Sequence, residues 1–131
     1  MSFKEMLSLL KYGQFEFFLL LLQRYFKYIP NDLKKKSYNK LLRSPMWSFY
    51  LRKNVKDIPD HIKRMAEEKC LEEPWWAYRL RREVKIFPEY MKRLLEKKAS
   101  EDPAVLEFLL EYVDDIPMDI RIELEKKLKD F

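Results

Sequence analysis

Glycine, cysteine and histidine are almost missing from this sequence, with one residue of each in 131. Phosphate-cradling loops need several glycines, and the usual nucleophile–base sets combine a hydroxyl or thiol with a nearby histidine. A single cysteine, Cys70, supports neither a disulfide framework nor a cysteine-based metal site. His61 is expected on the surface and Cys70 in the core. We therefore expect a protein that is not an enzyme, with no catalytic residue, metal or cofactor.

Long apolar runs are also scarce. Residues 17–22 form a run of six apolar residues, but charged residues bracket it on both sides. A membrane-spanning helix needs about 20 nearly uninterrupted apolar residues, and an export signal needs a longer apolar run followed by a cleavage site. We therefore expect no transmembrane segment and a cytoplasmic location. The 37% content of charged residues also resembles that of proteins from thermophiles.

Proline, by contrast, is placed regularly. All seven prolines fall into two rows with a spacing of 29 residues. One row contains Pro30, Pro59, Pro88 and Pro117, and the other contains Pro45, Pro74 and Pro103. A fixed period between 20 and 50 residues indicates stacked supersecondary units. The predicted units are 16–44, 45–73, 74–102 and 103–131.

Apolar residues repeat with the same period. The strongest row contains leucine in all four units, and other rows contain aromatic or β-branched residues. In the second unit, Trp47, Leu51 and Val55 follow the spacing of one helical face rather than the alternation of a strand. The predicted core residues are Trp47, Leu51, Val55, Trp76, Leu80, Val84 and Leu109.

Each unit is predicted to contain two helices, A and B. Helix A begins at the Pro45 row, because proline suits the first position of a helix. Ser44 and Asp102 are good N-cap residues for it, whereas Glu73 is a poorer one. Helix B begins at the Pro59 row. Residues 1–15 do not match the repeat, and a helix over 2–13 is predicted to cap the stack.

These features resemble the HEAT-like class of α-helical hairpin repeats. The resemblance rests on Asp102-Pro103-Ala104-Val105 opening helix A and on Ile116-Pro117 opening helix B, and it covers residues 16–131. It implies an all-α solenoid of about four 29-residue hairpins with an extra N-terminal helix, forming one domain over residues 1–131. It also implies a scaffold or binding surface.

The A helices carry a row of positive charge on their predicted exposed face. No acidic residue interrupts it in the first three units, whereas the fourth unit has acidic residues there. Residues 1–44 have a net charge of +6 and residues 103–131 one of −4. Helix B mixes signs, with the predicted surface pairs Lys63/Glu67, Lys92/Glu96 and Arg121/Glu125. The basic face contains Arg24, Lys27, Arg52, Lys53, Lys56, Arg81, Arg82 and Lys85.

Aromatic residues lie beside this basic face. Phe49 and Tyr78 share one row, and Met46 and Trp75 share another, all away from the leucine row. The favoured interpretation is that neighbouring helices cover them, because helices of a solenoid bury wide arcs. The alternative is a stacking surface of the kind used for single-stranded nucleic acids, with Trp75 and Tyr78 as its binding residues.

Another row departs from the repeat in its middle units. Tyr50 and Asn54 are followed 29 residues later by Arg79 and Glu83, where the outer units have aliphatic or aromatic residues. The four residues are a candidate groove. An ordinary ion pair between Arg79 and Glu83, four residues apart on one helix, is the favoured interpretation.

The sequence therefore predicts a non-enzymatic interaction scaffold. Its partner would be a protein or a second copy, bound through the basic face of the A helices. The alternative is a nucleic-acid-binding protein that uses the same face and its aromatic residues. A homodimer through the N-terminal helices is also predicted as an alternative, because apolar surface beyond the regular row is added by Phe17, Leu19, Leu20 and Leu21.

Overall fold

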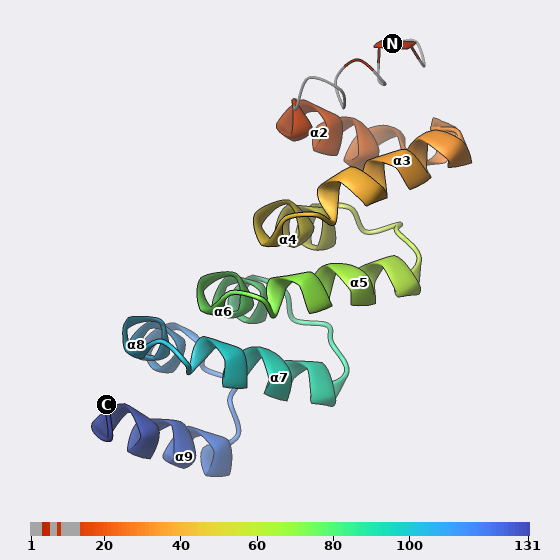
Figure 1. The fold of residues 1–131 in the computed structure, drawn as a ribbon. Helices are drawn as coiled ribbons and strands as arrows, with labels where there is room; N and C mark the ends of the chain where they lie inside the picture. The colour runs from red at the N-terminus through yellow and green to blue at the C-terminus, as the bar shows by residue number, and fades with distance from the viewer. Residues whose placement is uncertain (1–3, 6–7, 9–13) are drawn as a thin grey trace. The chain divides into compact units, whose positions relative to one another are not determined.

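The computed structural model describes residues 4–5, 8 and 14–131. Within residues 14–131 the chain forms eight α-helices, one short 3-10 helix and no strand, so the predicted all-α fold class is confirmed (Figure 1). Most of the predicted helix 2–13 lies outside the described residues. The elements are α2 (Phe15–Tyr25), η1 (Phe26–Tyr28), α3 (Asn31–Leu41), α4 (Pro45–Asn54), α5 (Asp60–Cys70), α6 (Pro74–Glu83), α7 (Glu89–Ala99), α8 (Pro103–Tyr112) and α9 (Met118–Lys129).

The two proline rows set the helix starts in different ways. Pro45, Pro74 and Pro103 are the first residues of α4, α6 and α8, as predicted. The other prolines precede α3, α5, α7 and α9 by one residue, so helix B begins one position later than predicted. Pro88 shows the reason, because its φ of −59° and ψ of 147° are extended rather than helical.

Side-chain caps fix two of the helix A starts. The Ser44 hydroxyl accepts a hydrogen bond from the Trp47 amide at 3.4 Å. Asp102 Oδ1 accepts from the amides of Ala104 at 2.9 Å and Val105 at 3.2 Å. Glu73 makes no side-chain cap, as its residue type predicted. A cap of this kind stabilises a helix by about 1 kcal/mol, so α4 and α8 are better anchored than α6 at this end.

The chain divides into two compact units, Met1–Lys69 and Cys70–Phe131. In the first unit, α2 and α3 contact α4, and a core forms around Phe18, Leu22, Leu33 and Leu51. Val55 belongs to this core, as predicted. Trp47 was predicted to be buried but is only half-buried, because it packs at the edge of the core.

In the second unit, α6 packs on α7 and α8, and α8 packs on α9. Leu80 and Leu109 are completely buried, as predicted. Trp76 and Val84 are only half-buried, so the prediction for these two residues was too strong. Contacts between consecutive helices agree with hairpin repeats, and a solenoid over the whole chain stays a prediction.

Tyr38 introduces an unpaired polar group into the first core. Its side chain is 6% exposed, and its hydroxyl has no hydrogen-bond partner among the described residues. Burial raises the pKa of this phenol from 10.0 to about 12. A buried hydroxyl without a partner costs about 1–3 kcal/mol, because it has lost its hydrogen bonds to water.

Tyr38→Phe should therefore stabilise the protein at neutral pH by about 1 kcal/mol, since it removes the unpaired hydroxyl and keeps the ring. Urea unfolding followed by circular dichroism measures the change. Tyr28→Phe is the matched control, because the Tyr28 ring is 84% exposed and should leave the free energy of unfolding unchanged. A Tyr38→Phe protein less stable than the wild type would show that the hydroxyl has a partner.

The Tyr38 phenol should make the protein less stable in alkali. Its pKa in the folded state lies above the ordinary value, so the folded protein favours the neutral phenol more than the unfolded chain does. This contribution to the free energy of unfolding is complete below pH 10 and is lost as the pH rises towards 12. The loss should reach about 2–3 kcal/mol, because one pKa unit corresponds to about 1.4 kcal/mol. Unfolding curves between pH 9 and 12 should show this decline in the wild type and a smaller one in Tyr38→Phe.

Candidate functional site

The structure divides the predicted basic face into exposed and buried residues. Six of its eight cations are exposed: Arg24, Lys27, Lys53, Lys56, Arg82 and Lys85. The other two are not. The side chain of Arg52 is 10% exposed, and Arg81 is completely buried. The expectation that these two arginines lie on the surface is therefore wrong, because each turns into its hairpin to meet a carboxylate.

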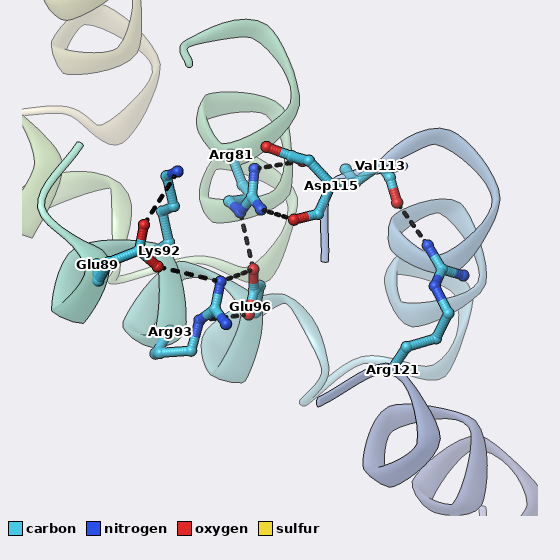
Figure 2. Close-up of polar contacts among 8 residues, drawn as sticks. All are labelled: Arg81, Glu89, Lys92, Arg93, Glu96, Val113, Asp115 and Arg121. Atoms are coloured by element: carbon cyan, nitrogen blue, oxygen red, sulfur yellow. Dashed lines mark hydrogen bonds and ion pairs between the residues drawn. The ribbon is translucent and has the colours of Figure 1, made fainter. Parts of the chain in front are cut away.

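Arg81 is the centre of a buried ion cluster in the second unit (Figure 2). Its Nε lies 2.8 Å from Glu96 Oε2, and its Nη1 lies 3.0 Å from Asp115 Oδ1. Arg93 Nη2 donates to the same Glu96 oxygen at 3.1 Å. Glu96 is 1% exposed. One buried carboxylate on α7 therefore holds two arginines, one from α6 and one from its own helix.

A matching cluster occurs 29 residues earlier, in the repeat 45–73. Arg52 Nε on α4 donates to Glu67 Oε2 on α5 at 2.7 Å. Arg64, one turn before Glu67 on α5, pairs with the other oxygen of that carboxylate. Glu67 is completely buried. Each cluster therefore joins helix A to helix B of one hairpin through an arginine–glutamate–arginine arrangement.

These clusters correct the interpretation of the B helices as ordinary solvated surface. Lys63 and Lys92 were expected to pair with Glu67 and Glu96, but they lie near Asp60 at 3.9 Å and Glu89 at 3.4 Å. The sequence did contain the signal. Three rows are identical in the two middle repeats, 45–73 and 74–102: Arg52/Arg81, Arg64/Arg93 and Glu67/Glu96.

The first and last 29-residue repeats, 16–44 and 103–131, replace the cluster with other residues. The rows of Arg52 and Glu67 contain Gln23 and Tyr38 in the first repeat and Leu110 and Glu125 in the last. Arg121 was expected to pair with Glu125. Its guanidinium instead donates to the carbonyl oxygens of Leu110 at 2.9 Å and Val113 at 2.6 Å, which secures α9 to the end of α8. Figure 2 shows the bond to Val113.

Asp115 shows how strongly Arg81 acts on its surroundings. Partial burial alone would raise the pKa of Asp115, but the charge of Arg81 and its hydrogen bond outweigh burial, with help from Lys85. The pKa of Asp115 is therefore held below its ordinary value of 3.8. The Asp115 contribution to stability is complete above this value and declines as the pH falls through the lower, folded pKa.

The aromatic residues of α6 and α8 form a continuous surface, defined here as Trp75, Phe108 and Tyr112 with Tyr78 beneath. The Trp75 and Phe108 ring centroids lie 5.9 Å apart, and the Phe108 and Tyr112 rings are stacked at 6.0 Å. Trp75 and Phe108 are each 41% exposed and Tyr112 is 46% exposed. Tyr78 is 1% exposed, so it supports the surface and offers no free ring for stacking.

Arg82 lies against this aromatic surface. Its guanidinium carbon is 4.9 Å from the centroid of the Tyr112 ring, and its Nη1 donates to the Tyr78 hydroxyl at 3.2 Å. These two contacts hold an exposed cation beside three exposed rings. The sequence had placed Trp75 and Arg82 together but did not identify Phe108 and Tyr112, which come from the next A helix.

The candidate groove residues fall in different units. Arg79 and Glu83 form the predicted ion pair on α6, with Arg79 Nε 2.8 Å from Glu83 Oε2. In the first unit, Tyr50 and Asn54 line a hollow between α2 and α4 with a volume of about 300 Å³. That hollow includes residues of α2 that the sequence interpretation had not associated with a groove.

His61 is exposed and Cys70 is buried. Among the residues that the structure describes, no three histidine, cysteine, aspartate or glutamate side chains are grouped as metal ligands would be. Of the described helices, none has the length and apolar content needed to cross a membrane.

Arg81→Glu should destabilise the protein by about 3–5 kcal/mol, because it places a second buried carboxylate beside Glu96. Arg82→Glu is the matched control on the neighbouring residue and should change the free energy of unfolding by no more than about 1 kcal/mol. Urea unfolding followed by circular dichroism measures both. Equal stability of the two variants would contradict the buried cluster.

Comparison of the chain with protein-family models, with curated proteins and with solved structures gave no match.

Proposed function

We propose that this chain is a non-enzymatic helical-repeat scaffold that binds a protein partner through the aromatic surface of α6 and α8. The observation that carries this proposal is the group of three exposed rings, Trp75, Phe108 and Tyr112, in mutual contact beside Arg82. The basic face predicted from the sequence contributes Arg82 to the edge of this surface.

The composition of the surface favours a protein partner. Tryptophan, tyrosine and arginine are the residues that most often dominate the binding energy of protein interfaces. Covering the exposed part of each ring would contribute on the order of 2 kcal/mol, from the area of an aromatic side chain and the free energy of apolar burial. The rings are also held in place by one another, so little conformational entropy is lost on binding.

The nucleic-acid alternative is less well supported. Tyr78, one of its two proposed stacking residues, is buried, and so is Arg81. The exposed side chains of α8 include Glu107 and Glu111, which would repel phosphates approaching the aromatic surface. Four exposed cations remain in the first compact unit: Arg24, Lys27, Lys53 and Lys56. We therefore expect this unit to bind nucleic acid only weakly and in a salt-sensitive way.

Self-association through α2 is a second candidate function. Phe17 and Leu20 on α2 are 59% and 46% exposed, which offers apolar surface to a second copy. Most of the N-terminal segment predicted to cover α2 lies outside the described residues. Light scattering across a range of protein concentrations would test for a homodimer, and a constant monomeric mass would exclude it.

The double variant Trp75→Ser/Phe108→Ser should abolish binding of the protein partner, because it removes two of the three exposed rings. Immobilised wild type, the double variant and the control Tyr90→Ser, which changes an exposed ring on α7, would be compared in nuclease-treated extract. Proteins retained by the wild type and the control but lost from the double variant are the expected result. Retention by all three would contradict the proposal.

Nucleic-acid binding is tested separately by fluorescence anisotropy with 20-nucleotide single strands at 50 and 150 mM salt. We expect weak binding at 50 mM that disappears at 150 mM, because phosphate contacts weaken steeply with salt. Trp75→Ala should leave the weak binding unchanged. Binding that survives 150 mM salt and requires Trp75 would instead establish the nucleic-acid alternative, because each stacked base contributes about 1–3 kcal/mol.

A further inference from the structure

The first unit contains a pair of adjoining hollows on α2 and α4, remote in sequence from the aromatic surface. The hollow lined by Tyr50 and Asn54 also includes Glu16, Gln23 and Trp47, and its volume is about 300 Å³. A neighbouring hollow of about 370 Å³ shares Glu16 and Trp47 with it. Glu16 and Trp47 therefore lie where the two hollows meet.

Glu16 is the one charged residue among the described residues that line either hollow. Its side chain is exposed, and it makes no ion pair within the described part of the chain. The nearest cation along α2 is Arg24, two turns further on. At physiological salt, charges that far apart are largely screened, so Arg24 offsets little of the negative charge of this carboxylate. A cation is the complementary ligand.

Aromatic residues line the same hollows as Glu16. The Phe15 and Trp47 ring centroids lie 5.2 Å apart in an edge-on arrangement, and Tyr50 is 6.0 Å from Trp47. Trp47 is only half-buried, so part of its ring is accessible from the hollows. Ring faces attract ammonium and guanidinium groups, and tryptophan does so most strongly. A carboxylate beside tryptophan and tyrosine rings is thus suited to an organic cation rather than a hydrated metal ion.

The borders of the hollows favour a peptide over a free amine. Phe17 is 59% exposed and Leu20 is 46% exposed, so apolar surface lies beside the carboxylate. Gln23 and Asn54 line the hollow with Tyr50 and offer amide donors and acceptors. Apolar flanks and amides match the side chains and backbone of a peptide, and a small amine would leave them uncovered.

We propose that the α2–α4 hollow binds a lysine or arginine side chain of a partner peptide that has apolar residues on either side. The cation lies between Glu16 and the Trp47 ring, and the flanking residues cover Phe17 and Leu20. This site is independent of the aromatic surface on α6 and α8, so either can fail without the other.

The test uses the full chain labelled with ¹⁵N, because its three tryptophans give separate indole signals. The probe is the peptide acetyl-Leu-Lys-Leu-amide, and its matched control replaces lysine by the neutral norleucine. We expect the Trp47 signal to shift saturably while those of Trp75 and Trp76 stay in place. The lysine peptide should bind about tenfold more tightly than the norleucine peptide, because the carboxylate and the ring both act on the charge.

Two variants assign the preference to the hollow. Glu16→Gln keeps the size of the side chain and should remove most of the tenfold difference between the peptides. Glu107→Gln changes an exposed glutamate on α8 and should leave the difference unchanged. Equal binding of both peptides to the wild type, or a preference that survives Glu16→Gln, would overturn the proposal.

Two further outcomes would reassign the occupant. If butylammonium alone binds as tightly as the lysine peptide, the site serves free amines, and the peptide proposal is wrong. If the Trp47 signal shifts with protein concentration in the absence of peptide, and Glu16→Gln stops this, the occupant is a second copy of the chain. A shift of all three tryptophan signals together would show non-specific binding and contradict the site.

Discussion

A buried glutamate that holds two arginines is the interaction on which each middle hairpin depends. Glu67 and Glu96 lie inside their hairpins, and each receives one arginine from helix A and one from helix B. Replacing such an ionic group with apolar residues of similar volume often costs nothing, whereas removing one partner is expensive. The clusters therefore specify how the two helices are paired more than they add to stability.

The exposed features of the protein follow from this use of charge in the interior. Because Arg52 and Arg81 are committed to carboxylates, the positive charge left on the A helices is less than the sequence predicts. What remains prominent at α6 and α8 is aromatic, with Arg82 held by Tyr78 and Tyr112. The proposed binding surface thus consists of rings with a cation at their edge, a composition closer to a protein interface than to a phosphate-binding face.

Much of the fold could be predicted from the sequence because its determinants are local. Proline at the first helical position and the Ser44 and Asp102 caps act within one turn of the helix, so their pattern indicates the helix starts directly. The leucine row identified the most deeply buried residues, including Leu51 and Leu80. The start of helix B was predicted one residue too early, because proline is compatible both with the first helical position and with the extended residue before it.

The candidate site was harder to predict because it depends on contacts between helices. A helical wheel placed Arg81 and Arg82 side by side on one exposed face, but a carboxylate 15 residues away draws Arg81 inward. Phe108 and Tyr112 approach Trp75 only when α8 packs on α6, and no spacing within one helix indicates this. Identical residues at the 29-residue period were the available signal, but the sequence analysis paired Glu67 and Glu96 with lysines of their own helices.

Arg81 also joins its hairpin to the next one along the chain. Besides Glu96 in its own hairpin, Arg81 contacts Asp115, which lies in the loop between α8 and α9. A change in that C-terminal loop can thus alter the polar environment of α7 through one guanidinium. Arg81 thus adds a charged link between the third and fourth hairpins to the packing of α6 on α8, so force applied to the loop before α9 has a route through this guanidinium into the preceding pair of helices.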